Sequence, residues 1–177
     1  MKRRYTSLPQ SLVRKYRTRD PFQIASGLGI SVRYINTKQQ KGFCKIILNR
    51  KFIFINRNMS EQMQRMICAH ELGHLLLHRQ ILAEKPFLLE YELFDIRNDA
   101  EYEANAFAAS LLIDEEELSE LLQSGADMVT AASALDINVN LLMIKLIEMQ
   151  KAGSAFHIPF TPDRKFLGRI ADKADSL

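Results

Sequence analysis

The sequence predicts a small α+β domain that is mostly helical, with a small antiparallel sheet before a central helix. Its 177 residues, 47% hydrophobic and 25% charged, have the composition of one compact domain. Three short runs rich in β-branched and aromatic residues lie close together near the N-terminal end, as expected for strands. Longer stretches on both sides of them repeat apolar residues at every third or fourth position, which is typical of amphipathic helices.

The N-terminal part is predicted to contain two short helices followed by the sheet. The first nineteen residues carry seven basic side chains and no acidic one, with apolar residues at near-helical spacing. Asp20 is a suitable N-cap and Pro21 a suitable first residue for a second helix, which Gly27 and Gly29 end. Residues 49–51 form a plausible tight turn between the last two strands. The predicted strands are residues 30–35, 43–48 and 52–55.

The rest of the chain is predicted to be helical, apart from its loops and its end. Ser60 caps a central helix that runs to about His78. A second strong helix begins at Asn98 or Asp99 and continues to Ile113. Shorter helices are expected at residues 114–122, 131–135 and 139–150. We therefore expect one domain over residues 1–152, with a helical C-terminal part at 114–152 and a loosely ordered tail at 153–177.

The composition also limits the cellular setting. No stretch approaches the roughly 18–20 apolar residues of a membrane-spanning helix, and the N-terminus lacks the apolar segment of a secretion signal. Two cysteines, Cys44 and Cys68, are too few for a disulfide scaffold. We expect a cytoplasmic protein with no membrane partner.

The net charge of +3 conceals a strong asymmetry along the chain. Residues 1–79 contain 16 lysines and arginines against 3 acidic residues, whereas residues 80–150 contain 3 against 15. The favoured interpretation is that the two parts pack against each other as complementary halves of one fold. The alternative is a basic surface that attracts DNA or an acidic partner.

The strongest functional signal is the segment His70-Glu71-Leu72-Gly73-His74 within the central helix. Residues four apart lie on one helix face, so both imidazoles can reach a single cation. Glu71 lies beside the same site, where it can accept a proton from an activated water instead of binding the metal. This pattern predicts a metal site in which His70 and His74 are ligands and Glu71 is the general base.

A zinc site of this kind needs a third protein ligand and one open position. The next strong helix offers Glu101 and Glu103, which project from different faces, so only one of them can serve. Asn105 lies four residues after Glu101, where it could hydrogen-bond the outer nitrogen of a ligand histidine, and this favours Glu101. The other glutamate would then lie on a solvated face. Ligands of this type also accommodate manganese, iron or cobalt.

Two further residues near the motif are expected to have supporting roles. His78 lies about 12 Å from His70 along the helix axis, too far for all three histidines to share one cation easily. We expect His78 to contact a ligand from outside or to pack in the core. Cys68 lies on a different helix face from His70 and is expected to be a buried structural thiol.

The segments HELGHLLLH at 70–78, EYEANAFAASLLI at 101–113 and DPFQIASGLGISV at 20–32 resemble the ImmA/IrrE-type metallopeptidases of bacteria, phages and mobile elements. The likeness is best over residues 20–113. It implies a zincin-like domain with one Zn²⁺ held by His70, His74 and Glu101, and with Glu71 as the base. It also implies that the protein cleaves or otherwise inactivates a helix-turn-helix repressor encoded nearby.

Several points stay open on the sequence alone. Tyr91, Tyr102 and His78 are the candidates for stabilising an oxyanion during hydrolysis. An alternative function is a non-enzymatic regulator or anti-repressor that acts by protein binding. A DNA-binding regulator is disfavoured, because the second helix of the helix-turn-helix-like pair, residues 139–150, is mostly apolar and contains Lys145 as its one basic residue.

Overall fold

A computed structural model of the chain describes residues 4–38, 40–79, 82 and 99–153. Tyr91, Asn98 and the tail beyond Gly153, for which loose order was predicted, lie outside the described residues. The described elements confirm a mostly helical α+β fold. They are α1 (Arg4–Tyr16), α2 (Pro21–Gly27), β1 (Ser31–Ile35), β2 (Gly42–Ile47), β3 (Arg50–Asn56), α3 (Glu61–Leu77), α5 (Asp99–Leu112), α6 (Glu115–Gln123), α7 (Met128–Ala134) and α8 (Val139–Lys151).

Polar side chains fix where the helices begin. The Asp20 carboxylate accepts a hydrogen bond from the Phe22 amide and Pro21 is the first residue of α2, as predicted. Ser60 caps α3 by accepting from the Met63 amide. Asp114 and Asp127 cap α6 and α7 in the same way, so α7 begins three residues earlier than the sequence suggested.

The sheet is mixed, so the prediction of an antiparallel sheet was wrong for one strand pair. The strand order is β1-β3-β2, with β2 antiparallel to β3 and β1 parallel to it. The chain passes from β1 to the far side of β3 before it turns back. The physical reason is burial: Ile53 and Ile55 of β3 are fully buried and occupy the centre, whereas β1 exposes Arg33 and Tyr34 and lies at an edge.

The turn between β2 and β3 is also placed differently from the prediction. It consists of Leu48 and Asn49, both of which have positive φ values, 48° and 61°. Two consecutive residues of this kind make the tight hairpin turn whose twist matches that of the flanking strands. The turn therefore begins one residue earlier than expected, and Leu48 is exposed at its tip.

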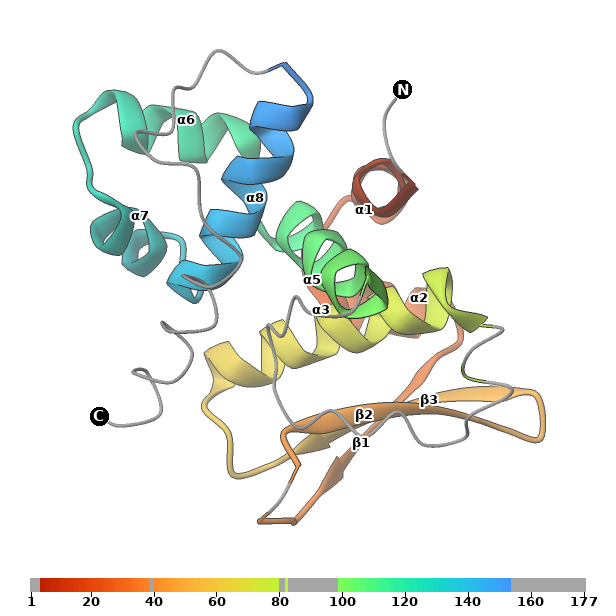
Figure 1. Cartoon of the computed structure of the whole chain (residues 1–177). Coiled ribbons are helices and arrows are strands. Elements are labelled where there is room, and N and C mark those ends of the chain that lie inside the picture. Colours follow the sequence, from red (N-terminus) through yellow and green to blue (C-terminus); the bar gives the residue numbers. More distant parts are fainter. Residues whose placement is uncertain (1–3, 39, 80–81, 83–98, 154–177) are drawn as a thin grey trace.

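The helices lie in layers over one face of the sheet (Figure 1). α3 crosses that face and contacts both β2 and β3, and α5 packs on α3. On the far side of α5 from the sheet, α8 packs against it, with α6 and α7 beside α8. The central part of α3 is buried from Met66 to Leu75, because the helix lies between the sheet and α5.

The described helices were also compared with the length and apolarity needed to cross a membrane. No single one of them meets both requirements. α7 and α8 meet them only when joined, and they are bent by 104° at the break between them.

Candidate metal centre

The structure brings His70, His74 and Glu101 together where α3 and α5 pack. The Nε2 atoms of His70 and His74 lie 3.0 Å apart. The Glu101 Oε2 atom lies 3.3 Å from Nε2 of His70 and 3.4 Å from Nε2 of His74. Both imidazoles are buried, and the Glu101 side chain is 13% exposed. These three residues form a group of side chains that could hold one metal ion.

Gly73 allows the two helices to approach this closely. A Cβ atom at this position would lie 3.2 Å from the Cα and carbonyl oxygen of Ala104 and 3.2 Å from a ring carbon of Phe107. All three distances are shorter than ordinary van der Waals contact, which is 3.4–4 Å. A glycine inside an otherwise uninterrupted helical run is the sequence signal for such an approach.

Asn105 fixes the orientation of the His70 ring. Its Oδ1 atom lies 2.8 Å from Nδ1 of His70, and Asn105 itself is fully buried. Because an amide oxygen only accepts, Nδ1 of His70 carries the hydrogen, and Nε2 presents its lone pair toward His74 and Glu101. This is the contact expected from the spacing of Asn105 and Glu101.

The donor set fits a divalent cation. A tetrahedral site with bonds of about 2.0–2.1 Å has ligand atoms about 3.3 Å apart, close to the three observed separations. Glu101 Oε2 is buried and has no hydrogen-bond partner among the described residues. Burial raises the pKa of Glu101, but the nearby His70 and His74 lower it more strongly, to about 2. The carboxylate is therefore ionised at neutral pH, as a metal ligand must be.

Glu71 is buried on α3 immediately after His70. It faces the beginning of β2, since a Cβ atom on Gly42 would lie 3.8 Å from Oε1 of Glu71. The same Cβ would lie only 2.4 Å from Ile67, so the packing of β2 on α3 requires glycine at position 42. Glu71 is not one of the three side chains grouped as possible ligands, and its role as the base stays a prediction.

Glu103 and His78 lie behind the cluster and contact each other. The Nδ1 atoms of His74 and His78 are 3.1 Å apart. On the other side of the His78 ring, Nε2 lies 3.1 Å from Oε2 of Glu103. Burial lowers the pKa of His78 although the hydrogen bond to Glu103 opposes this change. His78 therefore contacts His74 from outside, which is one of the two roles expected for it. No signal in the sequence indicated that Glu103 would contact His78.

The two described candidates for oxyanion stabilisation, Tyr102 and His78, already have other hydrogen-bond partners. The Tyr102 hydroxyl donates to Oε1 of Glu148 and accepts a hydrogen bond of 2.8 Å from Nζ of Lys151, both from α8. His78 has both ring nitrogens engaged by His74 and Glu103.

The cysteines do not contribute to the cluster. Cys44 and Cys68 are both buried and are not disulfide-bonded. Burial, together with the negative charges of Asp20 and Glu71, raises the pKa of the Cys68 thiol. A thiol in this environment stays protonated, as expected for a structural residue.

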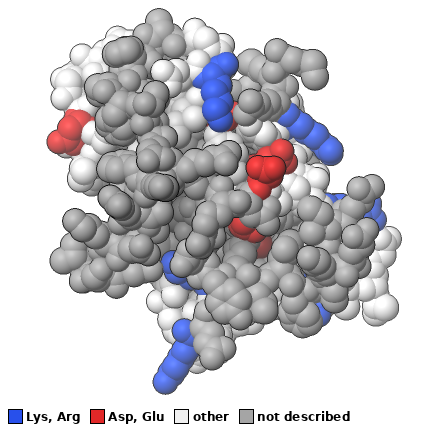
Figure 2. Space-filling view, viewed as in Figure 1, with Lys and Arg blue, Asp and Glu red and all other residues white. Residues whose placement is uncertain are grey.

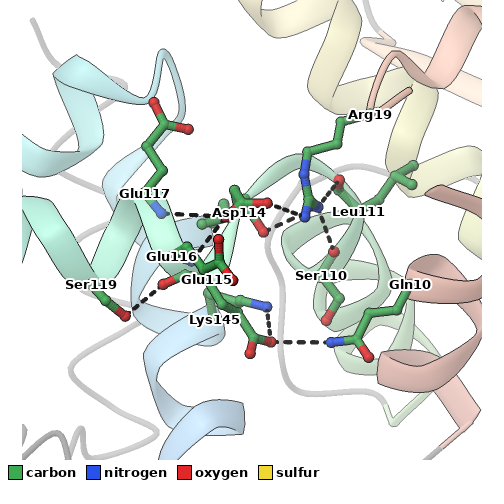
Figure 3. Close-up of polar contacts among 11 residues, drawn as sticks. Gln10, Arg19, Ser110, Leu111, Asp114, Glu115, Glu116, Glu117, Ser119 and Lys145 are labelled. Carbon is green, nitrogen blue, oxygen red and sulfur yellow. Dashed lines mark hydrogen bonds and ion pairs between the residues drawn. The ribbon is translucent and has the colours of Figure 1, made fainter. Parts of the chain in front are cut away.

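Ion pairs and hydrogen bonds connect the start of α6 to the basic N-terminal part and to α8 (Figure 3). Arg19 donates to the Leu111 carbonyl at 3.0 Å and forms an ion pair with Asp114. Glu115 accepts from Gln10 at 3.2 Å and from Lys145 at 2.8 Å. Slight burial raises the pKa of Asp114, but hydrogen bonds from Arg19 and two backbone amides lower it overall. These contacts agree with the interpretation of complementary halves.

The helix-turn-helix-like pair does not present a helix for reading DNA. α8 packs on α5 and is buried from Asn140 to Leu146, including Lys145, which pairs with Glu115. On the face drawn in Figure 2, the described basic side chains stand apart from one another, with acidic side chains between them. A groove-reading helix needs exposed polar and cationic side chains, whereas the exposed residues of α8 are Gln150 and Lys151 at its C-terminal end.

The protein is a small α+β domain with a candidate metal centre. Two helices, packed over a small mixed sheet, bring two imidazoles and a carboxylate together. The chain belongs to the peptidase M78 family, described as the IrrE N-terminal-like domain, which it matches over residues 25–145. It is also 39% identical over 105 residues to "uncharacterized immunity region protein 2" of Bacillus phage phi105. That match covers 59% of this chain and 65% of the phage protein. The resemblance inferred from the motifs is therefore confirmed at the level of the family.

Proposed function

We propose that the chain is a zinc-dependent peptidase of the HExxH type that inactivates a helix-turn-helix repressor by cleaving it. The observation that carries this proposal is the convergence of His70, His74 and Glu101 within 3.0–3.4 Å of one another. Membership of a peptidase family supports hydrolysis of a peptide bond as the reaction.

His70, His74 and Glu101 would hold the ion. When bound, a zinc ion supplies a Lewis acid that lowers the pKa of water and polarises the scissile carbonyl. Asn105 would keep the His70 ring in the tautomer whose Nε2 is available as a ligand, because its Oδ1 atom accepts from Nδ1. The burial of these side chains strengthens their electrostatic interactions by excluding water.

Glu71 would supply the proton transfers. Its carboxylate would accept a proton from the attacking water and pass it to the leaving amine. Support for this role comes from its position directly after His70 on α3 and from its absence from the three grouped ligands. General-base catalysis of this kind contributes about 10²–10⁴-fold to the rate.

The proposed substrate is supported by the phage relative, whose name places it in an immunity region. The resemblance of the motifs implies a repressor as the target, and a peptidase acting on a repressor would end repression irreversibly. The enzyme would meet such a substrate in the cytoplasm.

The test compares the wild-type protein with Glu71→Gln, each loaded with zinc and incubated with a helix-turn-helix repressor encoded beside the gene. Wild-type protein should cleave the repressor, a chelator should abolish cleavage, and Glu71→Gln should be slower by about 10²–10⁴-fold while it binds zinc normally. Equal cleavage by both proteins would sink the role assigned to Glu71. Tight binding of the repressor without cleavage would instead favour the non-enzymatic regulator.

A further inference from the structure

The outer nitrogen of His74 faces another imidazole, whereas the outer nitrogen of His70 faces the amide of Asn105. Two imidazoles in contact leave open which of them carries the shared hydrogen. For His74 to bind a cation through Nε2, its Nδ1 atom must be the donor. The arrangement beyond His78 decides this question.

The contact between His78 and Glu103 determines which ring nitrogens of His78 and His74 carry hydrogen. In the contact between Oε2 of Glu103 and Nε2 of His78, 3.1 Å apart, the carboxylate oxygen is the acceptor and the ring nitrogen carries the hydrogen. In a neutral imidazole the other nitrogen is then an acceptor. Nδ1 of His78 therefore accepts from Nδ1 of His74 at 3.1 Å, and Nε2 of His74 is left with its lone pair facing His70 and Glu101.

We propose that Glu103 and His78 are positioning residues, which form a hydrogen-bond chain that holds His74 in the tautomer able to bind a cation through Nε2. The inference rests on the proposed metal site. Two glutamates on one helix would then serve the same cluster differently: Glu101 contacts the imidazole Nε2 atoms directly, and Glu103 acts through His78. These hydrogen bonds also connect the buried His74 to the side chain of Glu103, which is 41% exposed.

Burial and backbone contacts of His78 support a role beyond surface packing. His78 is 8% exposed and caps the C-terminal end of α3, where its amide donates to the His74 carbonyl at 2.9 Å. The backbone of His78 is therefore fixed relative to His74, and its ring lies where it can hold the outer nitrogen of His74.

A carboxylate that accepts from an imidazole raises the basicity of that imidazole. Loss of such an outer partner typically weakens metal binding by about 10–100-fold. We expect the same loss of metal affinity, about 10–100-fold, when either Glu103 or His78 is removed, because each depends on the other to orient His74.

The first experiment records which ring nitrogen of each histidine carries hydrogen, by two-bond ¹H–¹⁵N NMR of the zinc-loaded wild-type chain. The chain contains four histidines, so the signals can be assigned by substitution. We expect His78 to carry hydrogen on Nε2 and His74 to carry it on Nδ1. The opposite arrangement at His78 would overturn the proposal, and the measurement itself is made on the wild-type protein.

The second experiment measures zinc affinity by competition with a chromophoric chelator. Glu103→Ala and His78→Phe should each lose about 10–100-fold, and Glu103→Gln, which keeps an acceptor oxygen, should lose less. Glu120→Ala, which removes an exposed glutamate of α6, is the matched control and should be unchanged. If wild-type protein binds zinc and the variants bind it equally well, the hydrogen-bond chain has no such role. If wild-type protein binds no zinc, the proposed function fails together with this inference.

Discussion

Replacing Gly73 by alanine tests whether the close approach of α3 and α5 builds the metal centre. The added methyl group would lie 3.2 Å from two backbone atoms of Ala104 and from the Phe107 ring. Since ordinary carbon contacts are about 3.5–4.0 Å, α5 must shift by a few tenths of an ångström. Backbone atoms cannot move aside as a flexible side chain would, so the shift also displaces Glu101 on the same helix.

Two opposing effects set the change in stability of the metal-free protein. Overpacking costs about 1–3 kcal/mol. Alanine in place of glycine in a helix recovers about 1 kcal/mol. The expected net loss is about 1 kcal/mol, which corresponds to a fall in Tm of about 2–4 °C for a domain of this size.

The effect on the metal centre should be larger than the effect on the fold. The distances from Glu101 to the two imidazoles, 3.3 and 3.4 Å, already match a tetrahedral site, and lengthening them weakens the third ligand. We expect zinc affinity to fall by about 10-fold, equivalent to about 1.4 kcal/mol. Thermal unfolding with and without zinc, combined with chelator competition, separates the two effects. A Gly73→Ala protein with unchanged zinc affinity and unchanged or higher stability would refute the reasoning.

Three further predictions concern the same contacts. Asn105→Ala should weaken zinc binding by about 10–100-fold in a chelator competition, because His70 loses the acceptor that fixes its tautomer. Zinc at about 100 times its Kd should stabilise the wild-type fold by about 2.7 kcal/mol in chemical unfolding, and Glu101→Ala should lose this gain at the same zinc concentration. Asp114→Ala should cost about 0.5–2 kcal/mol at pH 7 through loss of the α6 cap. Because the folded state lowers the pKa of Asp114, its contribution is complete above the ordinary value of 3.8 and is lost below it. The wild-type advantage over Asp114→Ala should therefore shrink as unfolding is measured at pH values below 3.8, and an advantage that instead grows on acidification would contradict the assigned pairing with Arg19.

Local signals in the sequence were sufficient for the starts of α2 and α3 and for selecting His70, His74 and Glu101, the three residues that could hold a metal ion. Asp20 and Ser60 cap helices through contacts within three residues, so no tertiary information is needed to recognise them. The convergence of His70 and His74 follows from helix geometry alone. Glu101 could be preferred over Glu103 because Asn105 follows it at one helical turn.

Other features depend on how distant segments meet in space. The parallel pairing of β1 with β3 accompanies the placement of β3, with its fully buried Ile53 and Ile55, at the centre of the sheet, which the order of strands along the chain does not reveal. The contact between Glu103 and His78 depends on the register of α5 against α3, to which Gly73 contributes. The sequence could place each residue on a helix but could not say which faces would meet.

The central claim is that two imidazoles and one carboxylate hold a single divalent ion. X-ray absorption at the zinc edge of the purified, zinc-loaded protein tests this claim most directly. We predict four nitrogen or oxygen ligands at about 2.0–2.1 Å, with outer scattering from two imidazoles. Sulfur at about 2.3 Å, a third imidazole, or the absence of tightly bound zinc would contradict the assignment of His70, His74 and Glu101.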